Sequence, residues 1–255
     1  MRYEMLSYHQ QDQVLRIDLH GLDIGYPRLL PLTQELRGLC SEIALDSEPH
    51  VIVIHWEQRR PVEGLGLGRY LLNADPGGGN LPACAEAIAS LDRPVIMAID
   101  GYAVGPVLEM ALAGDIRMAS PESYFGLPHI AESIIPWDGG TQRLTRVVGK
   151  SHALEMILTG RTFNSQEALR IGLVNQLAER SRLLPLVMEM ARKMASMSPL
   201  ALRCTKEVVL KGMDLHMEQG LRLEADVYFL LHTSKDRTEG IRAFQEKRPP
   251  RFVGE

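Results

Sequence analysis

Residues 94–99 read Pro-Val-Ile-Met-Ala-Ile, an apolar run with no polar alternation. Such a run is typical of a strand that is buried on both faces, as in a parallel sheet. A second run of this kind, Val-Ile-Val-Ile, occupies residues 51–54. Apolar residues recur at helical spacing over residues 32–43 and 81–91, directly ahead of these two runs. The alternation of helix and strand predicts an α/β core with parallel strands.

The two ends of the chain extend this pattern differently. Residues 14–19 alternate apolar and polar side chains, which predicts a half-buried strand. After residue 140 the pattern is mostly helical, and Asn164 with Glu167 predicts a capping box at the start of one helix. We therefore divide the chain into an α/β core over residues 1–195 and a C-terminal helical region over residues 196–255.

Composition narrows the class of ligand. The 255 residues include 28 Lys and Arg against 32 Asp and Glu, and the formal net charge is −4. Clustered positive charge is absent from the sequence, so neither a nucleic acid nor a membrane surface is expected as the main partner. Three widely spaced cysteines and an N-terminus without an apolar signal segment favour a cytoplasmic protein. A small molecule is the expected ligand.

Several common catalytic motifs are missing from the sequence. It contains no H-E-x-x-H, C-x-x-C or G-x-S-x-G, so we expect neither a bound metal nor a serine nucleophile. The glycine run at residues 64–68 lies eight residues beyond the strand that precedes it. A dinucleotide loop begins at a strand end, so this run is interpreted as a loop whose backbone approaches a ligand closely.

Glu109 is the first candidate catalytic residue. It is the one charged residue in the apolar stretch Pro106–Ala113, which is predicted to be a short helix with Pro106 in its first turn. A carboxylate in such a helix either faces a cavity or is buried, and burial would raise its pKa towards neutral pH. That pKa suits a general acid or base. The alternative is a structural Glu that binds backbone amides.

His129 and Asp138 form a second candidate pair. They lie in an apolar segment rich in Pro and Gly, residues 125–140, which leads into a predicted helix. A carboxylate beside a His holds the ring in one tautomer and makes it a stronger base. Alternatively, Asp138 caps the helix that begins near Gly139.

Longer blocks of the sequence have a family likeness. They are Arg93-Pro94-Val95-Ile96-Met97-Ala98-Ile99-Asp100-Gly101-Tyr102-Ala103, then Gly105, Glu109, Asp115-Ile116, Phe125-Gly126, Pro128, Ile135-Pro136, Gly139-Gly140-Thr141-Gln142-Arg143-Leu144, Leu158-Thr159-Gly160-Arg161, Ala168, Gly172-Leu173-Val174 and the ending at residues 239–248. In this order and spacing they strongly resemble the crotonase superfamily, the enoyl-CoA hydratase/isomerase family. The likeness covers nearly the whole chain.

The resemblance implies a crotonase-like spiral of ββα units and a C-terminal helical region that forms a homotrimer or a dimer of trimers. It also implies an acyl-CoA thioester as substrate, coenzyme A as part of that substrate rather than a separate cofactor, and a role as a lyase or isomerase in fatty acid metabolism. The enolate would be stabilised by two backbone N–H groups, one in the loop of Glu63 and Gly64 and one at the position of Pro106, after Gly105. Trp137 is expected to line the substrate site.

This sequence departs from the family pattern at Pro106. Proline has no N–H to donate, so one oxyanion donor is missing unless a neighbouring amide such as that of Val107 replaces it. Removing one such donor costs roughly 2.7–4 kcal/mol of transition-state stabilisation.

A second departure is His129, which stands where hydratases of this family have their second glutamate. The leading hypothesis is an acyl-CoA enzyme in which Glu109 and His129 exchange protons with substrate or water and Asp138 orients the histidine. The spacing of His129 and Asp138 also resembles the superfamily's β-diketone hydrolases, in which a His–Asp pair activates water for C–C bond cleavage. A small diketone is then the substrate. A third reading is an inactive oligomeric binding protein.

Three further positions match residues that hold coenzyme A in the family. Phe244 and Lys247 match positions that contact the adenosine end from a neighbouring subunit. Arg69, beside the glycine run, is suited to the phosphates because its guanidinium is a fork-shaped donor.

Overall fold

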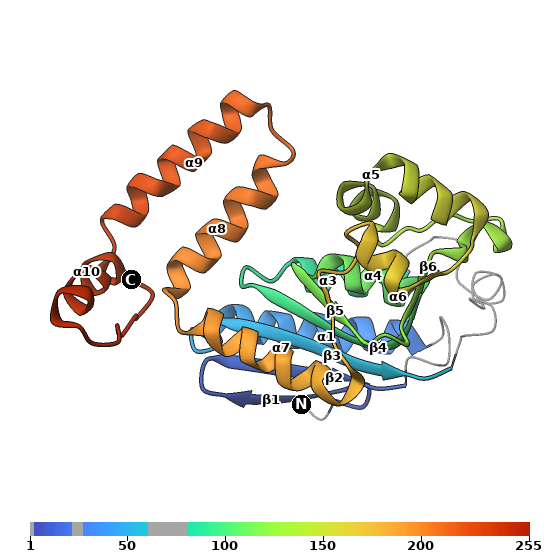
Figure 1. The fold of residues 1–255 in the computed structure, drawn as a ribbon, viewed down its shortest axis with the longest axis horizontal. Helices are drawn as coiled ribbons and strands as arrows, with labels where there is room; N and C mark the ends of the chain where they lie inside the picture. Colours follow the sequence, from blue (N-terminus) through green and yellow to red (C-terminus); the bar gives the residue numbers. More distant parts are fainter. Residues whose placement is uncertain (1–2, 22–27, 61–80) are drawn as a thin grey trace.

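The computed structural model describes residues 3–21, 28–60 and 81–255 (Figure 1). Its strands are β1 (Leu6–Gln11), β2 (Val14–Leu19), β3 (Val51–Gln58), β4 (Val95–Val104), β5 (Ile116–Ala119), β6 (Tyr124–Gly126), β7 (Phe163–Asn164) and β8 (Gln176–Leu177). Its helices are α1 (Leu29–Leu45), α3 (Cys84–Ala89), α4 (Pro106–Ala113), the 3-10 helix η3 (Pro128–Glu132), α5 (Gly140–Thr159), α6 (Ser165–Arg170), α7 (Arg180–Ala195), α8 (Pro199–Gly212), α9 (Met217–His232) and α10 (Lys235–Glu246).

The central sheet has the order β1-β2-β3-β4-β5-β8. Only its first pair, β1 with β2, is antiparallel, and the following pairs along this order are parallel. The α/β class and the parallel core predicted from the apolar runs are therefore confirmed. The helix predicted over residues 81–91 is shorter, because α3 begins at Cys84 and ends at Ala89.

Strand β3 shows why the apolar runs lack alternation. Its side chains point to both faces of the sheet, and both faces are covered. Ile52 and Ile54 belong to the core shared with α1, α3 and α4, whereas Val51 and Val53 belong to a second core against α7. Figure 1 shows α7 running along the sheet opposite α1 and α3.

Strand β4 connects this sheet to a smaller one. Its first half, Ile96 to Ile99, pairs with β5, and its end, Tyr102 to Val104, pairs with β6. The chain changes partner at Gly101, which has φ +98°, and a Cβ there would lie 1.9 Å from the carbonyl oxygen of Gln58. Only glycine fits this bend. The bend brings the end of β4, and the helix α4 that follows, to the edge of the core.

The C-terminal helices leave the core. After α7, the helices α8 and α9 form an antiparallel pair that extends away from the sheet (Figure 1). Helix α9 leads back to α10, which lies beside the start of α8, where Ser198 donates to Asp236 at 2.6 Å. No residue of α9 is buried. The predicted capping box is confirmed at α6, where the Asn164 side chain accepts the N–H of Glu167.

Candidate active site

Glu109 occupies a fixed position on α4. Its side chain is fully buried, and Oε1 accepts hydrogen bonds from the backbone N–H groups of Asp138 and Gly140, each at 2.9 Å. The helix begins at Pro106, as the sequence predicted, after Gly105 at φ +62°. The other oxygen, Oε2, has no hydrogen-bond partner among the described residues. One carboxylate oxygen is thus held, and the other is available for chemistry.

The environment of Glu109 tunes its proton affinity. Burial raises its pKa to about 7, although the N–H groups of Gly140 and Asp138 favour the charged form. The close approach depends on Gly140, because a Cβ at that position would lie 2.8 Å from Oε1 of Glu109. The expectation of a buried carboxylate with a pKa near neutrality agrees with this geometry, and so does the alternative that Glu109 binds backbone amides. Both describe the same side chain.

His129 lies beside this carboxylate. It is fully buried in η3, and its Nε2 is 3.6 Å from Oε2 of Glu109. Burial lowers its pKa to about 4. The ring of Trp137 meets the imidazole edge to face at 6.1 Å between centroids. At neutral pH the imidazole is therefore uncharged, and Glu109 is the member of the pair that titrates.

Asp138 lies in a different place from the one the sequence suggested. Its two carboxylate oxygens accept the N–H groups of Ala85, at 2.6 Å, and Glu86, at 3.1 Å. The carboxylate therefore caps α3 rather than the helix that follows Asp138 in sequence. Because Nε2 of His129 lies 3.6 Å from Oε2 of Glu109, the structure brings these two residues together, and it directs the Asp138 side chain towards α3.

The first turn of α4 has one open amide. Pro106 has no N–H, and the N–H groups of Leu108 and Glu109 both donate to the carbonyl oxygen of Gly105, at 3.0 and 3.2 Å. Among the described residues, no acceptor receives the N–H of Val107. This amide lies at the positive end of the helix, where negative charge is stabilised.

The remaining predicted site residues are Glu63, Gly64, Arg69, Phe244 and Lys247. Glu63, Gly64 and Arg69 fall outside the described residues. Phe244 lies on α10 with 86% of its surface exposed, and Lys247 follows that helix. Figure 1 shows α10 at the left edge of the molecule, apart from α4 near its middle. These two residues and Glu109 of the same chain therefore do not share a site.

The sequence did not predict that two backbone N–H groups hold Glu109 in place. The N–H groups of Asp138 and Gly140 fix Glu109, yet a backbone donor has no residue type by which to recognise it. The adjacent glycines Gly139 and Gly140 were the available signal, because paired glycines often mark a close backbone approach.

The described ranges contain neither a metal-type cluster nor a membrane-spanning helix. Within residues 3–21, 28–60 and 81–255, no group of three or more His, Cys, Asp or Glu side chains is arranged to hold a metal ion. In the same ranges, no helix has both the length and the apolar character needed to cross a bilayer.

Comparison with known proteins identifies the family. Residues 76–255 match the model of the enoyl-CoA hydratase/isomerase family. The chain belongs to this family. It is 40% identical over 173 residues to 2,3-dehydroadipyl-CoA hydratase of Escherichia coli, covering 68% of each chain. It is 41% identical over 172 residues to the mitochondrial methylglutaconyl-CoA hydratase of Mus musculus, covering 66% of this chain and 55% of the mouse protein.

Solved structures agree with this assignment. The enoyl-CoA hydratase of Bacillus anthracis superposes with a TM-score of 0.88 at 31% sequence identity, covering 99% of this chain and 100% of the other. The crotonase-like fold predicted from the sequence blocks is therefore confirmed, as is membership of the family.

Proposed function

We propose that the protein hydrates an enoyl-CoA thioester, with Glu109 as the group that moves the proton. The observation that carries this proposal is the fixed carboxylate of Glu109, whose Oε2 faces Nε2 of a neutral His129 at 3.6 Å. Relatives named as hydratases of acyl-CoA thioesters support the substrate class. A general base works best when its pKa lies near the working pH, and Glu109 meets that condition.

In the proposed reaction, ionised Glu109 removes a proton from a water molecule through Oε2. The water oxygen forms a bond to C3 of the substrate, and the electrons of the C2–C3 double bond move into the thioester carbonyl. The enolate then takes the same proton back from Glu109 at C2, so water is added and the carboxylate is regenerated. Neutral His129 orients the water and gives up no proton of its own, because its pKa of about 4 leaves it uncharged at neutral pH.

The enolate oxygen needs donors that are already in place. We propose that the open N–H of Val107 supplies one of them, in place of the amide that Pro106 lacks. The first turn of α4 then stabilises the developing charge through a fixed amide and through the helix dipole.

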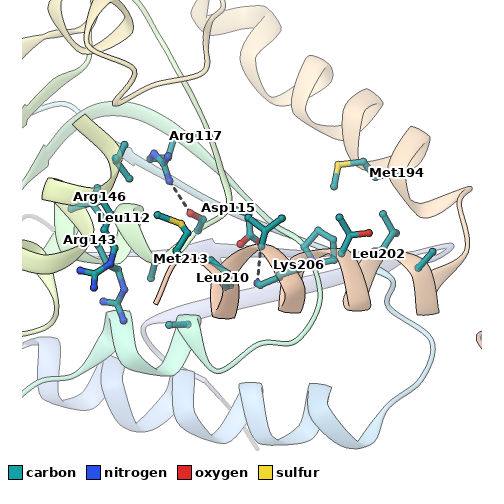
Figure 2. Close-up of a pocket in the computed structure, with 18 of the residues that line it drawn as sticks. Leu112, Asp115, Arg117, Arg143, Arg146, Met194, Leu202, Lys206, Leu210 and Met213 are labelled. Carbon is teal, nitrogen blue, oxygen red and sulfur yellow. Dashed lines mark hydrogen bonds and ion pairs between the residues drawn. The ribbon is translucent and has the colours of Figure 1, made fainter. Parts of the chain in front are cut away.

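We further propose that the active unit is an oligomer in which Phe244 and Lys247 of a neighbouring copy hold the coenzyme A. Phe244 belongs to α10 and Lys247 follows it, and α10 lies apart from α4, the helix of Glu109, in the same chain (Figure 1). Helix α9 exposes large apolar side chains, including Met217 at 79% and Phe229 at 68%, which favours cover by another copy. A mainly apolar cavity of about 600 Å³ is lined by residues of α8 and of the core, and Lys206 of α8 pairs there with Asp115 at 2.8 Å. Figure 2 draws the residues that line this cavity.

The β-diketone hydrolase remains the alternative that the sequence raised. It requires Asp138 to act on His129 as a dyad. Because both oxygens of Asp138 accept amides of α3, the geometry favours the hydratase.

Calorimetric titration tests the substrate class. Acetoacetyl-CoA is expected to bind in the micromolar range, and free coenzyme A much more weakly, because the 3-oxoacyl group carries an enolisable thioester that engages the amides of the site. Equal affinity for both ligands would contradict a site built around the acyl group. Binding of neither ligand, with cleavage of a β-diketone, would favour the hydrolase.

A further inference from the structure

The segment from Pro136 to Gly140 determines where the Glu109 carboxylate lies. Two of its N–H groups, those of Asp138 and Gly140, converge on the same oxygen, Oε1, at 2.9 Å each. A shift of this segment would move both donors together. The position of Oε2, which is proposed to act on water, therefore depends on how firmly the segment is held.

The side chain of Asp138 connects this segment to the start of α3. Its backbone N–H points to Glu109, whereas its carboxylate binds the N–H groups of Ala85 and Glu86 at the start of α3. A second tie runs parallel to it, because Nε1 of Trp137 donates to the carbonyl oxygen of Pro82 at 2.9 Å. A third tie comes from α5, where Arg143 donates to the backbone carbonyl of Asp138 at 2.7 Å.

These contacts make Asp138 the link between α3 and Glu109 of α4. We propose that Asp138 is a positioning residue: its carboxylate anchors the 136–140 segment to the N-terminus of α3 and so fixes the two amides that hold Glu109. This inference rests on the proposed function and deepens it, because it assigns Asp138 a role through Glu109 rather than through His129.

The physical basis is the unsatisfied start of a helix. The first N–H groups of a helix lack partners within it, and a carboxylate there gains both hydrogen bonds and the favourable helix dipole. Without the carboxylate, these N–H groups would donate to water, and the 136–140 segment would lose its hydrogen bonds to α3. Small misplacements are costly in catalysis, since a shift of about 1 Å can lower a rate about 100-fold.

The test compares three variants. Asp138→Ala removes the tie and the charge, whereas Asp138→Asn removes the charge and keeps an oxygen that accepts an amide. Asn164→Ala is the matched control, because Asn164 caps α6, a helix of six residues like α3, and its side chain accepts the N–H of Glu167 rather than a group of the 136–140 segment. Each of the two alanine variants is expected to lower Tm by about 2–4 °C.

The kinetic outcomes separate positioning from stability. Asp138→Ala is expected to lower kcat about 10–100-fold with KM changed less than about threefold, and Asp138→Asn to recover most of that loss. Asn164→Ala is expected to retain kcat. Unchanged kcat in Asp138→Ala, or an equal loss in Asn164→Ala, would overturn the proposal.

A second readout needs no substrate. The Glu109 carboxyl can be titrated by ¹³C NMR, with Glu109→Gln identifying its signal. Both Asp138 variants lack the charge, so comparing them tests the hydrogen bonds between side chain 138 and the N–H groups of α3. The two amides stabilise ionised Glu109, so the pKa of Glu109 is expected to be higher in Asp138→Ala than in Asp138→Asn. Equal values would overturn the positioning role. A wild type without hydratase activity would instead refute the proposed function alone.

Discussion

Glu109→Gln is expected to lower kcat for enoyl-CoA hydration by about 10²–10⁴-fold, the range that positioned acid–base groups contribute. Glutamine has nearly the same shape, and its oxygen still accepts the N–H groups of Asp138 and Gly140. It cannot accept the proton of the attacking water. The loss therefore falls on the chemical step, and KM is expected to change little. Steady-state kinetics on a short trans-2-enoyl-CoA measures both.

The same substitution is expected to stabilise the fold above neutral pH. The folded-state pKa of Glu109, about 7, lies above its ordinary value of 4.5, so the folded state binds a proton more tightly than the unfolded state. The ionised carboxylate therefore destabilises the fold. This destabilisation is absent below about pH 4.5, grows as the pH rises and is complete above about pH 7. The cost is about 3 kcal/mol. Glu109→Gln removes it, so denaturant unfolding should show a gain at pH 8 that disappears near pH 4.5.

Glu48→Gln is the control for removing a carboxylate outside the site, because Glu48 is exposed and lies between α1 and β3. It is expected to leave kcat unchanged. A Glu109→Gln variant that keeps more than half of the wild-type kcat would remove Glu109 from the reaction. A Glu109→Gln variant that is less stable than wild type at pH 8 would show that the ionised Glu109 carboxylate does not destabilise the fold.

Val107→Pro is expected to lower kcat by about 10²–10³-fold, the effect of removing one oxyanion donor. The substitution removes the N–H that no described residue accepts, in the first turn of the helix, where the N–H groups have no partner within the helix. Val107→Ala is the matched control, because it shortens the same buried side chain and keeps the amide. It should retain kcat within about threefold, and circular dichroism and Tm establish that both variants fold.

A complementary variant tests the same donor by addition. Pro106→Gly restores an amide at the preceding position. If Val107 already serves the enolate, kcat should change less than about threefold. A gain of about 10²–10³-fold would mean that the amide missing at Pro106 limits the reaction, and it would contradict the role given to Val107. This outcome is informative even if Val107→Pro fails to fold.

The sequence predicted those parts of the fold that depend on local patterns. The runs at residues 51–54 and 94–99 became β3 and β4, because a strand covered on both faces must be apolar throughout. The charged residue in an apolar helix, Glu109, proved to be buried. The short strands β7 and β8, of two residues each, carry no periodic signal, since two residues cannot show one.

The sequence could not predict contacts between distant segments. Asp138 and its partner Ala85 lie 53 residues apart, and nothing near Asp138 distinguishes a cap of α3 from a cap of α5 or from a partner of His129. The mostly helical pattern after residue 140 likewise did not reveal that α5 runs from Gly140 to Thr159 with non-helical dihedral angles at Gly149. Tertiary packing decides such cases, and local propensity does not.

The pH dependence of kcat/KM for enoyl-CoA hydration tests the central claim most directly. If ionised Glu109 removes the proton from water, kcat/KM should rise about tenfold per pH unit below pH 7 and level off above it, because the pKa of Glu109 is about 7. His129, with a pKa of about 4, should add no second limb above about pH 5. A rate that falls as the pH rises through 7 would contradict the account, because Glu109 would then have to be protonated and His129 would be the base.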